Sequence, residues 1–261
     1  ADISWSPVGN ETEWMLYYNG VGVYTNTIPT TITNLSPNTS YSCNVSAICS
    51  PSDTSGQSSG VVFTTGCAYS VAPITENFDN GFSPCWSQEL STDDFDWTLN
   101  DGGTNSNNTG PDDDVSGGGN YMYTEASAPR QNGDVAVMYS EQIDLSNLTN
   151  PQIHFYTHMY GSAIGDLQID MYDAGNYVNV FNKSGDQGDY WAEETVLINP
   201  TTNFVHFKIT GILSVDGNGD TWPGDIAIDE FSVMEAIATD LAVLEGVTVS
   251  ACDLSSSEQI S

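Results

Sequence analysis

The chain has 261 residues and carries 35 Asp and Glu against 3 Lys and Arg, a formal net charge of −32 at pH 7. With so few cations no positively charged stripe can form, which excludes nucleic acid and anionic membrane surfaces as partners. The hydrophobic share of 39% is enough to build folded cores, and no apolar run is long enough to span a membrane.

Runs in which apolar and polar residues alternate recur along the chain, whereas no run keeps helical spacing over three turns. The clearest alternating runs are residues 152–156, 167–171, 204–209 and 226–228. Gly, Asn, Asp and Pro separate them, and this pattern is typical of the strands of β-sandwiches. We therefore expect an all-β protein in which each domain packs two sheets face to face.

The first expected domain covers residues 1–66 and contains five short strand-like runs. Its most specific feature is the string Leu35-Ser36-Pro37-Asn38-Thr39-Ser40-Tyr41, which is preceded by Trp5 and followed by Phe63-Thr64-Thr65. These residues resemble the fibronectin type III family. The resemblance implies a β-sandwich that lacks the family's first strand, because the chain starts just before Trp5.

The second expected domain covers residues 67–237. Its motifs are Glu76-Asn77-Phe78-Asp79, Cys85-Trp86, Asp96-Trp97-Thr98, Gly110-Pro111-Asp112-Asp113-Asp114, Gly118 to Glu125, Phe155 to Gly161, Trp191, and Gly224 to Glu230. In this order and spacing they resemble the MAM family, named for meprin, neuropilin-type receptors and a receptor phosphatase. The resemblance implies a jelly-roll β-sandwich. Asn77 replaces the family's usual first cysteine, and Cys67 is the candidate substitute.

The remaining residues, 238–261, are too few to bury an apolar face of their own. We expect them to begin a further immunoglobulin-like domain or to form a tail, with Cys252 unpaired. Segments chained in this way resemble secreted multidomain bacterial proteins. A composition low in Lys and rich in Asn, Ser, Thr, Gly and Asp also favours secretion, where disulfides persist.

The other four cysteines allow more than one pairing. Cys43 and Cys49 are expected on one strand, ~20 Å apart at ~3.3 Å per residue, which is too far to bridge. Cys67 and Cys85 flank the first strand of the MAM-like domain and could join its ends. Either Cys43 or Cys49 could instead reach Cys67. We favour the pair Cys67–Cys85.

No catalytic motif is evident in the sequence. HExxH, GxSxG and phosphate-loop patterns are missing. His154 and His158 are four residues apart, and on a strand that separation is ~13 Å, so they cannot share one metal ion. With 35 acidic residues, a pair of carboxylates is no indication of a glycosidase. We expect a chain that is not itself an enzyme.

Two acidic groups are candidate Ca²⁺ sites, since calcium takes six to eight oxygen ligands. One is the D-x-N-x-D loop of Asp216, Asn218 and Asp220, with Asp225 as a later ligand. Ala227 stands where an EF-hand would place its Glu, so an EF-hand is excluded. A polar hairpin turn is the alternative interpretation of this loop.

The other candidate combines Asp79, the run from Asp112 to Asp114, and Asp229. The MAM resemblance implies a cation between the opening strand, an acidic loop and the closing strand. Asp79 follows Phe78 and Asp229 follows Ile228, so both carboxylates are expected to point away from the core. Carboxylates that converge at a strand junction repel unless a cation neutralises them. The alternative is a solvated acidic face.

Aromatic residues outside the expected core could bind sugar, since rings on a sandwich rim stack on the apolar face of a pyranose while Asp and Asn bind its hydroxyls. Trp222, flanked by turn formers, is the first candidate. Tyr160, Tyr177, Tyr190 and Trp191 follow, with Asp220 as a polar partner. The alternative is that these rings pack inside or anchor loops.

Together these features predict a non-catalytic, calcium-stabilised extracellular module that binds a polysaccharide or another glycan. Three alternatives remain open. The chain could be a protein–protein adhesion module, a spacer without a site, or an accessory part of a larger secreted hydrolase or protease.

Overall fold

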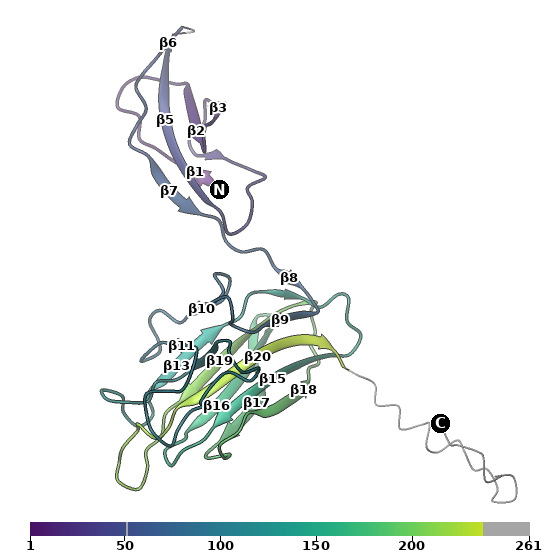
Figure 1. Ribbon diagram of the computed structural model, residues 1–261. Helices are drawn as coiled ribbons and strands as arrows, with labels where there is room; N and C mark the ends of the chain where they lie inside the picture. The colour runs from purple at the N-terminus through teal and green to yellow at the C-terminus, as the bar shows by residue number, and fades with distance from the viewer. Residues whose placement is uncertain (51, 237–261) are drawn as a thin grey trace, which may run out of the picture.

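The computed structural model describes residues 1–50 and 52–236, and there the chain is built from strands, turns and loops (Figure 1). The expectation of an all-β protein is confirmed. No helix long and apolar enough to cross a membrane occurs in the described part of the chain. The segment expected as a further domain, 238–261, lies outside the described residues.

The N-terminal sandwich has one small sheet and one larger sheet. The small sheet pairs β1 (Asp2–Ile3) with β4 (Thr30–Thr31). The larger sheet contains β3 (Val21–Thr25), β2 (Trp14–Tyr18), β5 (Ser40–Ser50), β6 (Asp53–Thr54) and β7 (Val61–Thr64). Its buried core cluster consists of Leu16, Ile32 and Cys43. The strand arrangement agrees with two facing sheets, while the fibronectin type III assignment stays a prediction.

The C-terminal sandwich also has two sheets. Sheet 1 contains β10 (Ser87–Gln88), β13 (Val135–Tyr139), β19 (Phe204–Ile212), β16 (Asp166–Asp173), β17 (Asn176–Ser184), β14 (Ile143–Asp144) and β8 (Ser70–Val71). Sheet 2 contains β11 (Thr98–Asn100), β12 (Tyr121–Tyr123), β20 (Ile226–Glu235), β15 (Pro151–Met159), β18 (Ala192–Leu197) and β9 (Ile74–Glu76).

The alternating runs of the sequence become the central strands of this second sandwich. Along β16 the burial pattern alternates at every residue, as expected for a strand with one face toward the core. The core between the sheets contains 27 buried residues, among them Phe155, Phe207 and Phe231. Phe231 packs 5.3 Å from Phe207 and 5.8 Å from Phe155, measured between ring centroids, so strands of both sheets meet at this ring.

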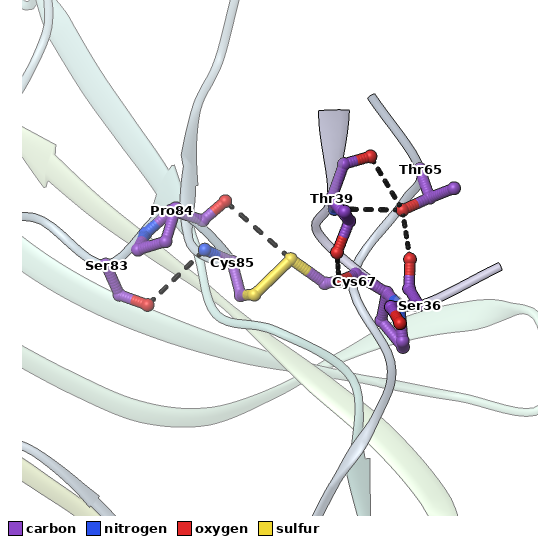
Figure 2. The surroundings of a disulfide bond; sticks show 8 residues. Ser36, Thr39, Thr65, Cys67, Ser83, Pro84 and Cys85 are labelled. Atoms are coloured by element: carbon purple, nitrogen blue, oxygen red, sulfur yellow. Dashed lines mark hydrogen bonds between the residues drawn. A yellow bond between two sulfur atoms is a disulfide. The ribbon is translucent and has the colours of Figure 1, made fainter. Parts of the chain in front are cut away.

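A disulfide joins Cys67 to Cys85 across the segment that leads into the C-terminal sandwich, with their Cα atoms 5.6 Å apart (Figure 2). Cys67 lies three residues after the end of β7, and Cys85 precedes β10. The expected pair is confirmed, and its alternatives are excluded because Cys43 and Cys49 are both free thiols on or near the single long strand β5. Cys252 lies outside the described residues.

Candidate functional site

The long loop between β11 and β12, residues 101–120, lies over the outer face of sheet 2. Side chains from that face hold the loop: Trp191 Nε1 donates to the carbonyl of Asp113 at 3.0 Å, and the Tyr121 hydroxyl donates to the carbonyl of Gly102. Tyr121 and Tyr123, which point away from the core, are nevertheless fully or almost fully buried. The sandwich therefore has a partial third layer, and polar groups are buried beneath it.

Three of the predicted calcium ligands meet at one end of this loop. β9 and β20 are neighbours, with Glu76 opposite Phe231, so the first and last strands of sheet 2 lie side by side as expected. Asp79 follows β9, Asp114 belongs to the covering loop, and Asp229 is on β20 with its Oδ2 accepting from Val115 N at 3.1 Å. We name Asp79, Asp114 and Asp229 the acidic junction.

Gly119 makes the junction possible because a side chain there would collide with two carboxylates. A Cβ at Gly119 would lie 1.9 Å from Asp79 Oδ1 and 2.7 Å from Asp114 Oδ2. Both contacts are far below van der Waals distance, so the absence of a side chain at Gly119 lets these two carboxylates pack against its backbone. The Asp79 oxygen also accepts from the backbone N–H of Asn120 at 3.0 Å.

The pKa values of two carboxyl groups in the acidic junction are shifted in opposite directions. Burial raises the pKa of Asp229 to about 7, against hydrogen bonds from the N–H groups of Val115 and Glu230. Burial also acts to raise the pKa of Asp114, but hydrogen bonds from Ser116, Gly119 and Gly118 outweigh it and lower the value to about 2. Asp229 is only 1% exposed because the covering loop closes over it, so the alternative of a solvated acidic face does not hold at this residue.

Asp112, the fourth predicted ligand of this group, is not part of the acidic junction. It is exposed and lines a different hollow beside Tyr160 and Asp189. Throughout residues 1–50 and 52–236, no three His, Cys, Asp or Glu side chains gather closely enough to hold a metal by themselves. A cation at the junction would therefore need backbone carbonyls or water as additional ligands.

The D-x-N-x-D loop forms a hydrogen-bonded turn between β19 and β20. Asp216 Oδ1 accepts from the N–H groups of Asn218 and Asp220 at 2.8 and 3.0 Å, and these bonds lower the pKa of Asp216. Asp225 takes no part, because it is fully buried and accepts from Ala126 N at 3.0 Å. The structure thus corrects the predicted grouping of calcium ligands. Asp220 is exposed in the turn, whereas Asp225 is buried in a separate environment.

The first-choice aromatic residue, Trp222, does line a cavity. Its side chain is 40% exposed and shares a cavity of about 420 Å³ with Tyr160. The other lining residues are Asn107, Asn108, Gly161, Ser162, Asp186, Asp216 and Pro223. A hollow of about 250 Å³ adjoins it, because Asn107, Asn108 and Tyr160 line both. We call the two together the Trp222 groove.

A close backbone approach brings the two rings of the groove to the same cavity. Gly161 has φ of +141°, and a Cβ there would lie 2.2 Å from the carbonyl oxygen of Pro223. The N–H of Ala163 donates to that same oxygen at 3.0 Å. Tyr160 and Trp222, which are 62 positions apart in the chain, are each one residue from this contact.

The remaining predicted binding residues lie outside the groove. Trp191 is half-buried, with its ring 5.7 Å from that of Tyr121, and it anchors the covering loop instead of presenting a free face. Tyr190 is 58% exposed but lines neither hollow. Asp220 does not line the cavity either, although its neighbour Asp216 does.

Sequence reasoning missed the polar residues of the groove. Asn107 and Asn108 come from the covering loop, Ser162 follows β15, and Asp186 follows β17. The asparagine-rich run at 105–108 was the available signal, but nothing local to it indicates that the loop reaches Trp222. His154 and His158 are apart as expected, with His154 Nε2 2.8 Å from Glu193 and His158 Nε2 3.3 Å from Asp189.

A larger hollow, about 890 Å³, occurs in the N-terminal sandwich and is lined by Glu11, Glu13, Tyr24 and Cys49 among others. Tyr24 is its one aromatic ring, and a hydrogen bond to Glu13 raises the pKa of its hydroxyl. Without a second ring or an amide side chain other than Asn10, it offers less for recognition than the Trp222 groove does.

Comparison with known proteins shows that the second sandwich matches a protein family. The family model described as MAM domain, meprin/A5/mu, matches residues 77–236. MAM domain-containing glycosylphosphatidylinositol anchor protein 2 of Homo sapiens is 34% identical over 184 residues, which cover 63% of this chain and 19% of that protein. Neuropilin-1a of Danio rerio is 30% identical over 148 residues, covering 55% and 15%. The chain thus spans less than a fifth of these relatives.

Solved structures show remote likeness. The K1 cleaved adhesin domain of Lys-gingipain from Porphyromonas gingivalis W83 has a TM-score of 0.43 at 16% identity, covering 64% of this chain and 99% of that one. A carbohydrate-binding module from the β-sandwich superfamily has a TM-score of 0.40 at 11% identity, covering 87% of each chain. At these scores the likeness carries no functional argument.

Proposed function

This chain belongs to the MAM domain family, and from that premise we propose that it is a non-catalytic extracellular binding module whose Trp222 groove takes a carbohydrate. The observation that carries the proposal is the convergence of Trp222 and Tyr160 on one cavity with amide and hydroxyl side chains around them. Two rings supply flat apolar surface for pyranose faces, and Asn107, Asn108 and Ser162 supply donors and acceptors for sugar hydroxyls.

The carboxylates of the groove are poorly suited to catalysis. Asp186 Oδ1 accepts from the N–H groups of Gly188 and Gly161, at 3.0 and 3.3 Å. Backbone hydrogen bonds lower the pKa of Asp216, so this carboxylate does not hold a proton that it could donate near neutral pH. Glycoside hydrolysis needs one carboxyl group that stays protonated, and Asp216 does not supply it.

Calcium stabilisation at the acidic junction is a second part of the proposal. Asp79, Asp114 and Asp229 offer only oxygen ligands, which calcium prefers, and two of these carboxylates pack close together against Gly119. A bound cation would favour the charged form of Asp229, which burial otherwise disfavours. The junction would then fasten the covering loop to β20, and that loop supplies one wall of the groove.

An adhesion role is the alternative that a specific observation favours. Tyr69, Val71 and Phe204 form an exposed apolar patch beside β8, with the rings of Tyr69 and Phe204 5.1 Å apart. Exposed aromatic clusters of this kind mark protein contacts. Light scattering that shows a concentration-dependent dimer, lost in Phe204→Ser, would favour this function over sugar binding.

A glycan array followed by titration calorimetry tests the carbohydrate proposal. We expect Trp222→Ala to weaken the binding of array hits at least tenfold while leaving the melting temperature unchanged. Tyr177→Ala, which removes a similarly exposed ring on β17, is the matched control and should bind normally. Equal affinities of the two variants, or an array without hits, would overturn the proposal.

EDTA tests the calcium proposal separately. We expect EDTA to lower the melting temperature of the C-terminal sandwich and added CaCl₂ to restore it. Asp114→Asn should abolish the calcium response, whereas Asp216→Asn, in the hydrogen-bonded turn, should keep it. A melting temperature that EDTA does not move, or an equal response in both variants, would contradict the acidic junction as a calcium site.

A further inference from the structure

Carboxylates surround the Trp222 groove and no cation lines it. Asp186 and Asp216 line the larger cavity, and Asp112 and Asp189 line the adjoining hollow. Within these two sets of lining residues there is neither Lys nor Arg. Any ligand in the groove therefore meets negative charge, and the sign of the ligand's own charge becomes decisive.

The few cations of the chain are engaged elsewhere. The guanidinium of Arg130 lies 4.3 Å from the ring centroid of Phe95. Lys183 pairs with Glu194 on β18, and Lys208 lies 5.8 Å from the ring centroid of Tyr177 on sheet 1. These are all 3 Lys and Arg residues of the sequence, so no lysine or arginine side chain offsets the charge of the groove.

Several carboxylate oxygens in the groove remain free to contact a ligand. In the described structure, Asp112 makes no side-chain hydrogen bond, and Asp186 uses only its Oδ1. Asp189 contacts His158, and burial lowers the pKa of that imidazole despite the neighbouring Asp189. Burial thus weakens the ability of the imidazole to offset the charge of Asp189.

Resting on the carbohydrate function proposed above, we infer that the groove selects glycans that carry protonated amino groups, of the glucosamine type, over neutral N-acetylated ones and against uronate or sulfated ones. The rings of Trp222 and Tyr160 attract a cation through their faces as well as stacking on the sugar. The carboxylates at Asp112 and Asp186 add ionic hydrogen bonds to the ammonium group. An anionic sugar finds no compensating charge and is repelled.

The test compares three matched oligosaccharides by titration calorimetry at about pH 6, where sugar amines are charged. The probes are glucosamine trimer, N-acetylglucosamine trimer and galacturonate trimer. We expect the glucosamine trimer to bind about tenfold more tightly than its N-acetylated form, and the galacturonate trimer not to bind. The preference should fall as salt rises, because the attraction is partly screened.

Variants separate the groove from the general charge of the protein. Asp112→Asn should reduce the preference for the amine several-fold, and Asp112→Asn combined with Asp186→Asn should abolish it. Asp53→Asn on β6 of the N-terminal sandwich removes one equivalent exposed charge and should leave it unchanged. Asp112 makes no hydrogen bond within the described structure, so its single variant tests the inference even where the double variant is unstable.

The outcomes distinguish this inference from the function on which it rests. If the N-acetylglucosamine trimer binds as tightly as the glucosamine trimer, the inferred selectivity is wrong. The same holds if Asp53→Asn reduces the amine preference as much as Asp112→Asn does. Neither result would contradict the carbohydrate function. An absence of binding for all three trimers and for array glycans would overturn the carbohydrate function itself. Tenfold amine preference that depends on Asp112 would support both.

Discussion

The two sandwiches of this chain bury very different amounts of apolar surface. In the N-terminal sandwich the buried cluster comprises Leu16, Ile32 and Cys43, with a few half-buried rings packed against it. In the C-terminal sandwich it comprises 27 residues, and a disulfide joins its first segment to the sheet edge. Hydrophobic burial is the main driving force of folding, so the second unit is expected to be the more stable.

The two sandwiches also differ in the loop that covers one sheet of the C-terminal sandwich. In the C-terminal sandwich the loop 101–120 covers the outer face of sheet 2 and buries polar groups such as Asp225 and Asp229. Burial perturbs the pKa of both carboxyl groups, and the same loop forms a wall of the Trp222 groove. A third layer on the C-terminal sandwich therefore accounts both for the shifted pKa values of these carboxyl groups and for one wall of the Trp222 groove.

The largest expected effect is the loss of a central ring. Phe231→Ala should cost about 3–5 kcal/mol, since Phe231 is fully buried and packs on Trp86, Phe155 and Phe207. Scanning calorimetry should show two transitions, of which only the upper one moves. Leu16→Ala is the reciprocal variant and should move only the lower transition. A single transition that shifts in both variants would show that the two sandwiches unfold together.

Removing the disulfide should have the next largest effect. Cys67 and Cys85 close a loop with a sequence separation of 18, for which chain entropy gives about 3 kcal/mol. The double variant Cys67→Ser, Cys85→Ser should lower the upper transition and leave the lower one in place. Cys43→Ser is a poor comparison because Cys43 is in the core, so Cys49→Ser, at an exposed thiol, serves as the control.

A smaller effect is expected from pH through Asp225. Burial raises the pKa of Asp225 to about 7 in the folded state, against about 3.9 when unfolded. The folded state thus keeps a proton that the unfolded state releases, so this contribution is complete below about pH 4 and is lost as pH rises through about 7. The difference of about 3 pKa units sets an upper limit of about 4 kcal/mol on this contribution to the stability of the C-terminal sandwich.

Urea unfolding in EDTA from about pH 4.5 to 7.5 measures this dependence. Asp225→Asn should reduce this dependence, because an amide does not titrate but still accepts from Ala126 N through its oxygen. Asp229, whose pKa burial also raises to about 7, should keep the remainder. Asp134→Asn, at a half-buried position that follows the turn at 132–133, is the control that keeps the dependence. If the variant and the control fall equally with pH, general charge repulsion and not Asp225 is the cause.

The smallest effect on stability is expected at the proposed binding ring. Trp222→Ala should change the free energy of unfolding by less than about 1 kcal/mol, because its ring is 40% exposed and is absent from the core cluster. Both calorimetric transitions should stay in place. A loss of several kcal/mol would mean that Trp222 acts as a structural anchor, as Trp191 does.

Local sequence patterns were sufficient to predict some of the strands. The alternation along 167–171 and 204–209 predicts β16 and β19, because one sheet face is buried and the other is not. Local patterns did not predict the burial of Asp229 or the role of Trp191. Both residues face away from the core, but the covering loop buries Asp229 and accepts a hydrogen bond from Trp191. Facing away from a core implies exposure only where nothing else covers the sheet.

The sequence alone determined the all-β class, the resemblance of the second unit to the MAM family, and the pairing of Cys67 with Cys85 as the favoured choice, because each depends on the order and spacing of residues along the chain. It named Trp222 as a candidate binding ring but left packing or loop anchoring open. The tertiary structure decided which carboxylates meet and which rings share a cavity. Asp79, Asp114 and Asp229 converge, and Tyr160 reaches Trp222 through Gly161 and Pro223, only because segments distant in the chain pack together.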